Sequence, residues 1–354
     1  MLFSLKNQEK KYIDKSDTES IVKDLMINPE KITELDLTSN VFKPKAFEGI
    51  CECIEKMKNL KFVVLDEIFT TLVKEDMLSC FVMVSKALMN KNLEVLDLSN
   101  NALSSDLPNE FLDLLSSLDS LKVLKVRNCG LGLMGADKLG ECFTRLKKGN
   151  LEYLDLAQNR FFKFPQILAI GLSTLKNLRV LHLEFNTIEK DSMSSFLPLL
   201  LDKPLEILDI RDNFLNLKGC QTLGEMFCVM DLKELMIGDC LMHDEGVKAF
   251  LKEASTRPVT LGLPGDIEVN VNCELLDLSY NDFEQESLNL LVDFVEKYQI
   301  RKLLINGNYF EETDKLKTTM EKYGGVLVEE DEYKEEEIIK EEIDENLLGM
   351  VSNL

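Results

Sequence analysis

Apolar residues recur along this chain at a fixed spacing. The segment from Leu93 to Leu103 reads LEVLDLSNNAL, with leucines at its first, fourth, sixth and eleventh positions and an Asn at its ninth. Similar segments recur from Ile32 to about Gly325, each with Asn or Cys at the ninth position as a marker. The markers are Asn40, a degenerate Ile68, Asn101, Cys129, Asn159, Asn186, Asn213, Cys240, Asn281 and Asn308. Successive markers lie 27 to 33 residues apart, except for one interval of 41 residues.

Each unit predicts one strand followed by one helix. The LxL run before the marker favours a β-strand, and after Cys129 the residues Ala136, Leu139 and Phe143 form an apolar stripe at helical spacing. We expect the marker to turn inward and to satisfy backbone groups of the turn. Strands pack about 4.8 Å apart, whereas helices need about 8–10 Å. The units therefore predict an α/β solenoid, a horseshoe with a parallel sheet on its concave face and helices on its convex face, which resembles the leucine-rich-repeat proteins.

The periodicity predicts one continuous domain in place of two or three globular ones. Residues 1–31 are expected to form an N-terminal cap, and residues 32–325 the repeat domain of about ten units. The long interval contains residues 257–272, where Pro and Gly indicate an inserted loop or hairpin. Residues 326–354 are expected to be an acidic tail, because Glu329 to Glu345 holds eleven acids and two lysines. Such a segment favours a solvated tail or a frayed helix.

Composition narrows the range of partners. A net charge of −22 argues against unaided binding to nucleic acid or to an anionic membrane, and it favours a partner with a basic surface. No apolar stretch approaches the roughly 18 residues of a spanning helix, and the N-terminus lacks the hydrophobic core of a secretory signal. We therefore expect a cytoplasmic protein. The nine scattered cysteines are typical of reduced thiols that pack as small hydrophobic residues.

Little in the sequence indicates chemistry within the chain itself. The two histidines, His182 and His243, have no neighbouring ligand residues in a recognised spacing, and His182 is expected as a concave surface residue without catalytic duty. Cys51 and Cys53 lie two residues apart on a predicted helix, which favours packing over zinc binding. The glycines of CGLGLMG fall at a repeat turn rather than in a dinucleotide-binding unit. We expect neither a metal nor a cofactor, and no self-contained enzyme.

The repeat pattern separates core residues from residues at the exposed edge of the sheet. In the unit LKVLKVRNCGLG the core is predicted to contain Leu121, Leu124, Val126, Cys129 and Leu131. Asn128 precedes the marker and is expected at the exposed rim, where it either forms the turn or contacts a partner. The same row in other units contains Asn100, Gln158, Phe185, Asp212, Asp239 and Tyr280. This mixed polar and aromatic row suits recognition, although any exposed row would be largely polar.

Several motifs resemble those of one family. The segments NCGLGLMGADKLGECF, LDIRDNFLNLKGC and LLINGNYFEE, the opening FSLKNQ and the terminal acids are similar, in order and spacing, to the Ran GTPase-activating proteins. The resemblance covers Met1 to about Gly325. It implies a protein that is not itself an enzyme but stimulates GTP hydrolysis by a GTP-bound, Ran-like small GTPase in nucleocytoplasmic transport, and that we expect to act as a monomer.

The resemblance also assigns roles to residues. Members of this family act without an arginine finger by ordering the catalytic Gln of the GTPase, and Asn128 matches the Asn that assists. An amide can donate and accept at once, which suits it to fix a neighbouring side chain. The residues expected to bind the partner are Lys74, Asn100, Arg127, Gln158, Arg160, Asp212 and Asp239.

Two departures and two alternatives accompany this hypothesis. Leu72 stands where the family carries an Arg, with Lys74 as the nearby cation, and the segment AQNR that ends at Arg160 lacks a second cation of the family motif. The alternative function is a non-catalytic acidic binding module, either a histone-binding protein or an inhibitor of a basic enzyme. The 27–28-residue period of most units counts against the histone-binding proteins, whose repeats have about 23 residues.

Overall fold

The computed structural model describes residues 1–256 and 273–331. In these ranges, twelve short strands form one parallel sheet, in which they lie side by side in their order along the chain. The strands are β1 (Leu2–Ser4), β3 (Glu34–Asp36), β5 (Phe62–Val64), β6 (Val95–Asp97), β7 (Val123–Lys125), β8 (Tyr153–Asp155), β9 (Val180–His182), β10 (Ile207–Asp209), β11 (Glu234–Met236), β12 (Leu275–Asp277), β13 (Lys302–Leu304) and β14 (Val326–Val328). A second, two-stranded sheet pairs β2 (Lys11–Tyr12) with β4 (Val41–Phe42).

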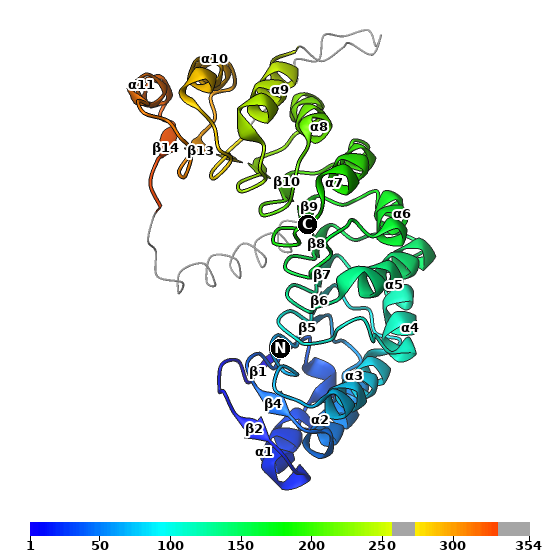
Figure 1. The fold of residues 1–354 in the computed structure, drawn as a ribbon. Helices are drawn as coiled ribbons and strands as arrows, with labels where there is room; N and C mark the ends of the chain where they lie inside the picture. Colours follow the sequence, from blue (N-terminus) through cyan, green and yellow to red (C-terminus); the bar gives the residue numbers. More distant parts are fainter. Residues whose placement is uncertain (257–272, 332–354) are drawn as a thin grey trace.

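Helices alternate with the strands. The α-helices are α1 (Lys15–Leu25), α2 (Pro44–Lys56), α3 (Lys74–Leu88), α4 (Asn109–Ser117), α5 (Gly132–Arg145), α6 (Gln166–Thr174), α7 (Lys190–Phe196), α8 (Leu217–Val229), α9 (His243–Ser255), α10 (Leu288–Tyr298) and α11 (Asp314–Glu321). Short 3₁₀ helices are η1 (Pro29–Lys31), η2 (Leu197–Leu200) and η3 (Gln285–Ser287). Figure 1 shows the helices on the outside of an arc and the sheet on the inside. The predicted α/β solenoid, with a concave parallel sheet and convex helices, is confirmed.

The markers hold the turns together as the pattern predicts. Asn159 is fully buried, and its Nδ2 donates to the backbone oxygens of Val126 (2.8 Å), Leu156 (3.0 Å) and Ala157 (3.0 Å). Its Oδ1 accepts from the backbone N–H of Cys129 at 3.1 Å. One buried amide thus forms hydrogen bonds with backbone groups of two successive repeats. These groups lie beyond the ends of the short strands, so the sheet cannot satisfy them.

The core lies between the sheet and the helices. All five core residues predicted for the unit before α5 are buried, as are the three residues predicted for its helical stripe. The nine cysteines are free and buried, as expected for thiols that pack as small hydrophobic residues. Gly130 and Gly132 adopt φ values of +64° and +55°, so they serve the turn. Among the described residues, no helix combines the length and the apolar character needed to cross a bilayer.

The two ends of the sheet differ from the predicted boundaries. Strand β1 lies within the expected cap, yet it pairs with β3 and is the first strand of the main sheet. Strand β14 lies within the expected tail, yet it pairs with β13. Leu327 packs against the core, which explains why the sheet continues past Gly325. The expected insertion at residues 257–272, and residues 332–354 of the expected tail, lie outside the described residues.

Candidate functional site

The residues that precede the markers form a continuous rim, just after the carboxyl ends of the strands of the main sheet. Each lies in the left-handed region, with φ of +54° at Asn100, +52° at Asn128 and +57° at Gln158. Phe185, Asp212, Asp239 and Tyr280 share this conformation, with φ between +51° and +58°. The backbone N–H of Asn128 donates to the carbonyl of Ala157 at 2.9 Å, and the corresponding bond recurs at the other rim positions. The row therefore forms the turns of the repeats. Its side chains are exposed in five units and partly exposed at Asn100 and Asp212.

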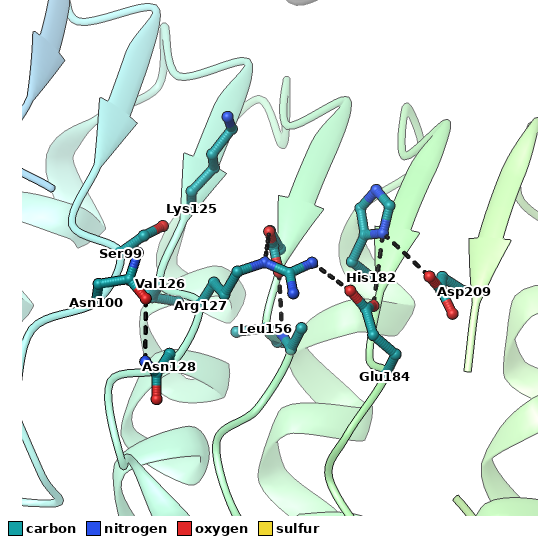
Figure 2. A network of polar contacts seen from close by, with 12 residues as sticks. Ser99, Asn100, Lys125, Val126, Arg127, Asn128, Leu156, His182, Glu184 and Asp209 are labelled. Atoms are coloured by element: carbon teal, nitrogen blue, oxygen red, sulfur yellow. Dashed lines mark hydrogen bonds and ion pairs between the residues drawn. The ribbon is translucent and has the colours of Figure 1, made fainter. Parts of the chain in front are cut away.

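Three rim-side residues form a chain of side-chain hydrogen bonds. Asn128 is exposed, and its Nδ2 donates to Oδ1 of Asn100 at 3.0 Å (Figure 2). Asn100 Nδ2 in turn donates to Oδ1 of Asp66 at 2.9 Å. Among the described residues, no hydrogen bond to Oδ1 of Asn128 is found. The Asp66–Asn100–Asn128 chain therefore orients the Asn128 amide and leaves its oxygen open to a donor from outside.

Beside this rim, charged side chains alternate in sign across the concave face. We call this set the concave charge network: Asp97, Lys125, Arg127, Asp155, His182, Glu184, Asp209, Arg211 and Asp277. Most of its carboxylates are buried, and each lies near a cationic or imidazole group. The network arises because residues two apart on a strand share a face, and neighbouring strands bring the equivalent positions side by side.

Arg127 is a central member of the network. Its Nε donates to Asp155 at 2.8 Å. Its Nη2 donates to Oε1 of Glu184, two repeats away along the sheet (Figure 2). Burial alone would lower the pKa of the guanidinium, but the two carboxylates outweigh this and raise it. Arg127 is among the residues expected to contact the partner. In this structure its charge is already engaged within the chain.

His182 is not isolated, contrary to the expectation from sequence. Its Nδ1 lies 3.5 Å from Oε2 of Glu184 and 3.9 Å from Oδ2 of Asp209. Burial lowers the pKa of His182, but the nearby carboxylates more than compensate and the net shift is upward. Burial would likewise raise the pKa of Glu184, yet His182 and Arg127 hold it well below its usual range. The sequence carried a signal for part of this cluster, because the alternation in LHLEF places His182 and Glu184 on one face; Asp209 comes from the next strand.

The remaining expected contact residues are distributed over the rim and a helix start. Gln158 and Arg160 are both exposed in the turn after β8, and Arg160 makes no ion pair with the described residues. Lys74 is the first residue of α3, where it pairs with Asp106 of the next repeat. Leu72 is partly buried against the core, so an apolar residue at this departure from the family motif has a packing role.

Asp212 and Asp239 are successive residues of the rim. Burial raises the pKa of Asp212, and the negative charge of Asp239 adds to this shift. A carboxylate whose pKa is raised by a neighbouring negative charge favours a cationic contact. This end of the rim therefore suits a basic partner surface, whereas the Asn100 and Asn128 end offers amides.

The exposed rim and its oriented amides suit the recognition and positioning of a partner's side chains. The parallel sheet of short strands, with one strand and one helix per repeat, defines the chain as a leucine-rich-repeat protein. A family model described as Leucine Rich Repeat matches residues 92–114, the repeat that contains β6. The chain is similar to Ran GTPase-activating protein 1 of Saccharomyces cerevisiae, with 24% identity over 303 residues that cover 79% of this chain and 72% of that protein. The resemblance to the Ran GTPase-activating proteins indicated by the sequence motifs is thereby confirmed.

Other relatives share the repeats. NACHT, LRR and PYD domains-containing protein 14 of Homo sapiens is 25% identical over 280 residues, which cover 76% of this chain and 23% of that protein. An internalin of Listeria monocytogenes superposes with a TM-score of 0.53 and 15% identity over 90% of this chain and 78% of the other. A leucine-rich-repeat protein of Leptospira interrogans superposes with a TM-score of 0.50 and 20% identity over 84% of this chain and 72% of the other. At these identities the two structures establish the fold alone.

Proposed function

We propose that this chain is a GTPase-activating protein for a Ran-like small GTPase in its GTP-bound form. The observation that carries the proposal is the similarity to yeast Ran GTPase-activating protein 1 along 79% of the chain. The chain would not hydrolyse GTP itself; the partner would supply the active site. A cytoplasmic location, a monomeric state and a role in nucleocytoplasmic transport belong to the same proposal and come from the resemblance and the sequence.

The proposed mechanism uses an amide and no arginine finger. Asn128 is exposed on the rim, and its Nδ2 is held by Asn100, which supports a role in orienting a partner side chain through the remaining oxygen. That oxygen can accept from the amide N–H of the catalytic Gln, which in turn aligns the attacking water. The engagement of Arg127 by Asp155 and Glu184 further supports a mechanism in which this cation stays out of the active site.

The direct test is multiple-turnover GTP hydrolysis by Ran with a small amount of this chain. We expect phosphate release well beyond the molar amount of the chain, at a rate proportional to its concentration. The alternative is a non-catalytic acidic binding module, which the acidic Asp212 and Asp239 on the rim favour. Binding to Ran·GTP without accelerated hydrolysis, or no binding at all, would support that alternative and contradict the activator hypothesis.

A further inference from the structure

Three potential metal ligands converge on the concave face, between β9 and β10. His182 and Glu184 lie two residues apart on one strand end, and Asp209 lies beside His182 on the neighbouring strand. One ligand atom of each, the imidazole Nδ1 and two carboxylate oxygens, lies within 4.8 Å of the other two. Figure 2 shows the three side chains directed toward one another. The activator function proposed above does not use this cluster.

Two of these atoms are buried and lack a hydrogen bond. They are Nδ1 of His182 and Oε2 of Glu184, and Glu184 is only 2% exposed. Their separation of 3.5 Å exceeds the roughly 2.7–3.2 Å of an N–H···O hydrogen bond. Buried polar atoms nearly always form hydrogen bonds, so an imidazole nitrogen and a carboxylate oxygen that face each other without one require an explanation.

The surrounding residues orient the carboxylates. Arg127 donates to Oε1 of Glu184, and this leaves Oε2 for the imidazole side. Arg211 donates to both oxygens of Asp209, at 3.0 Å to Oδ1 and 2.6 Å from Nη2 to Oδ2, which fixes the plane of that carboxylate. Hydrogen bonds of this kind hold the ligands of metal centres in place.

The local charge also favours a divalent cation. Four buried carboxylates, those of Asp155, Glu184, Asp209 and Asp277, stand against the two guanidinium groups of Arg127 and Arg211. The half-buried Glu234 of β11 adds further negative potential at His182. Tyr153 of β8 contributes a neutral ring, 5.4 Å from the imidazole between centroids.

We propose that His182, Glu184 and Asp209 bind a divalent transition-metal ion of the zinc type. One imidazole nitrogen and two carboxylate oxygens are ligands that zinc accepts, and a three-residue site leaves a further position for water or a partner's group. Ligand atoms bound tetrahedrally at about 2.0–2.1 Å lie about 3.3 Å apart, close to the 3.5 Å between Nδ1 and Oε2. The nine cysteines are buried, so they do not compete for the ion in the folded protein.

Zinc titration of the full chain, after treatment with a chelator, tests the proposal. Bound metal is measured after gel filtration for the wild type, His182→Ala, Glu184→Gln and His243→Ala. We expect one zinc ion per wild-type chain and at least tenfold weaker binding in the first two variants. His243→Ala is the matched control, because that exposed histidine faces a single carboxylate, Asp282, at 3.2 Å, and it should bind zinc as the wild type does.

A second readout covers the case in which a variant fails to fold. The chain contains two histidines, so NMR of the wild-type imidazoles gives two sets of signals, which His243→Ala assigns. One equivalent of Zn²⁺ should shift or broaden the His182 signals and leave those of His243 in place. Three outcomes would each overturn the proposal and leave a histidine–glutamate ion pair. These are absence of zinc binding by the wild type, unchanged zinc affinity in His182→Ala, and a His182 signal that responds to protons but not to zinc.

Discussion

At the scale of single residues, the backbone conformation of the rim decides what a substitution tests. Asn128 has φ of +52°, a region that Asn tolerates and that costs other non-glycine residues about 1–2 kcal/mol. The Asn128→Ala substitution therefore removes the amide and strains the turn at once. The Asn128→Gly substitution removes the same amide without strain, because glycine adopts positive φ freely.

We predict that Asn128→Gly causes a fall of about 100-fold, or about 2.7 kcal/mol, in the saturated rate of the GTP hydrolysis by Ran that this chain stimulates. The reason is loss of the amide that orients the catalytic Gln, so affinity for Ran·GTP should change much less. The control is Gln158→Gly, which lies on the same rim at φ of +57°. As an expected contact residue it should affect the affinity for Ran·GTP but keep a nearly full saturated rate. Full stimulation by Asn128→Gly would remove Asn128 from the mechanism.

The two arginines near the site should behave differently. Arg127→Ala leaves the buried carboxylates of Asp155 and Glu184 without their cation, so we expect it to lower the free energy of unfolding by about 2–4 kcal/mol. Arg160→Ala should leave the free energy of unfolding within about 0.5 kcal/mol, because this exposed side chain makes no ion pair with the described residues.

The same pair tests the absence of an arginine finger. Urea denaturation measures the stability of both variants, and GTP hydrolysis at saturating concentrations measures their activity. We expect less than a tenfold loss of saturated rate for Arg160→Ala, whereas removal of a true finger would cost about a thousandfold or more. A loss of that size would show that Arg160 acts as one.

At the scale of elements, helix spacing on the convex face depends on a few glycines. Gly140 of α5 lies so close to the carbonyl of Ile167 in α6 that a Cβ at this position would overlap it, and Gly171 of α6 faces the backbone of Gly140 in return. Backbone cannot yield as a flexible side chain can. These two helices therefore approach each other closely, and neither glycine position accommodates a larger residue without a shift of the backbone.

We predict that Gly140→Ala lowers the free energy of unfolding by about 1–3 kcal/mol, because overpacking outweighs the gain of up to about 1 kcal/mol in helix propensity. The urea midpoint measures the effect. The matched control is Gly49→Ala in α2, where a Cβ would meet only a methyl group of Val22 at 3.1 Å. That variant should be neutral or slightly more stable, and equal destabilisation of both would contradict the packing argument.

At the scale of the whole molecule, an open solenoid must end its sheet at both sides. Strand β14 covers β13, and Leu327 packs against a core that includes Leu303 and Met320. The acidic residues beyond Asp331 add to the net charge of −22. The boundary between the part that stabilises the fold and the part that contributes charge therefore lies after β14, and not before it as the sequence suggests.

Two truncations should separate these contributions. Ending the chain at Gly325 removes β14 and should lower the free energy of unfolding by about 2 kcal/mol, the value for burying one large apolar side chain. Ending it at Asp331 should leave thermal stability unchanged and slow association with a basic partner. Because charge interactions are screened beyond about 8 Å at physiological salt, the slowing should be larger at low salt in stopped-flow measurements. Equal stability of both truncations would show that β14 contributes nothing to the fold.

The sequence alone determined the repeat, because its signal is local. The spacing of leucines and of markers such as Asn101 and Cys129 sets strand, turn and helix within about 30 residues, and the different widths of strands and helices make the stack curve. The exposed position of Asn128 follows from the same pattern. Its role in GTP hydrolysis remains a prediction.

The tertiary structure alone decided which side chains meet across repeats. Arg127 reaches Glu184, 57 residues later, and His182 lies beside Asp209 of the next strand. These contacts depend on sheet register and on side-chain direction, which no local pattern specifies. The sequence did not predict the ends of the sheet for the same reason. The short runs at Leu2 and Val326 become strands only because they pair with the edges of β3 and β13.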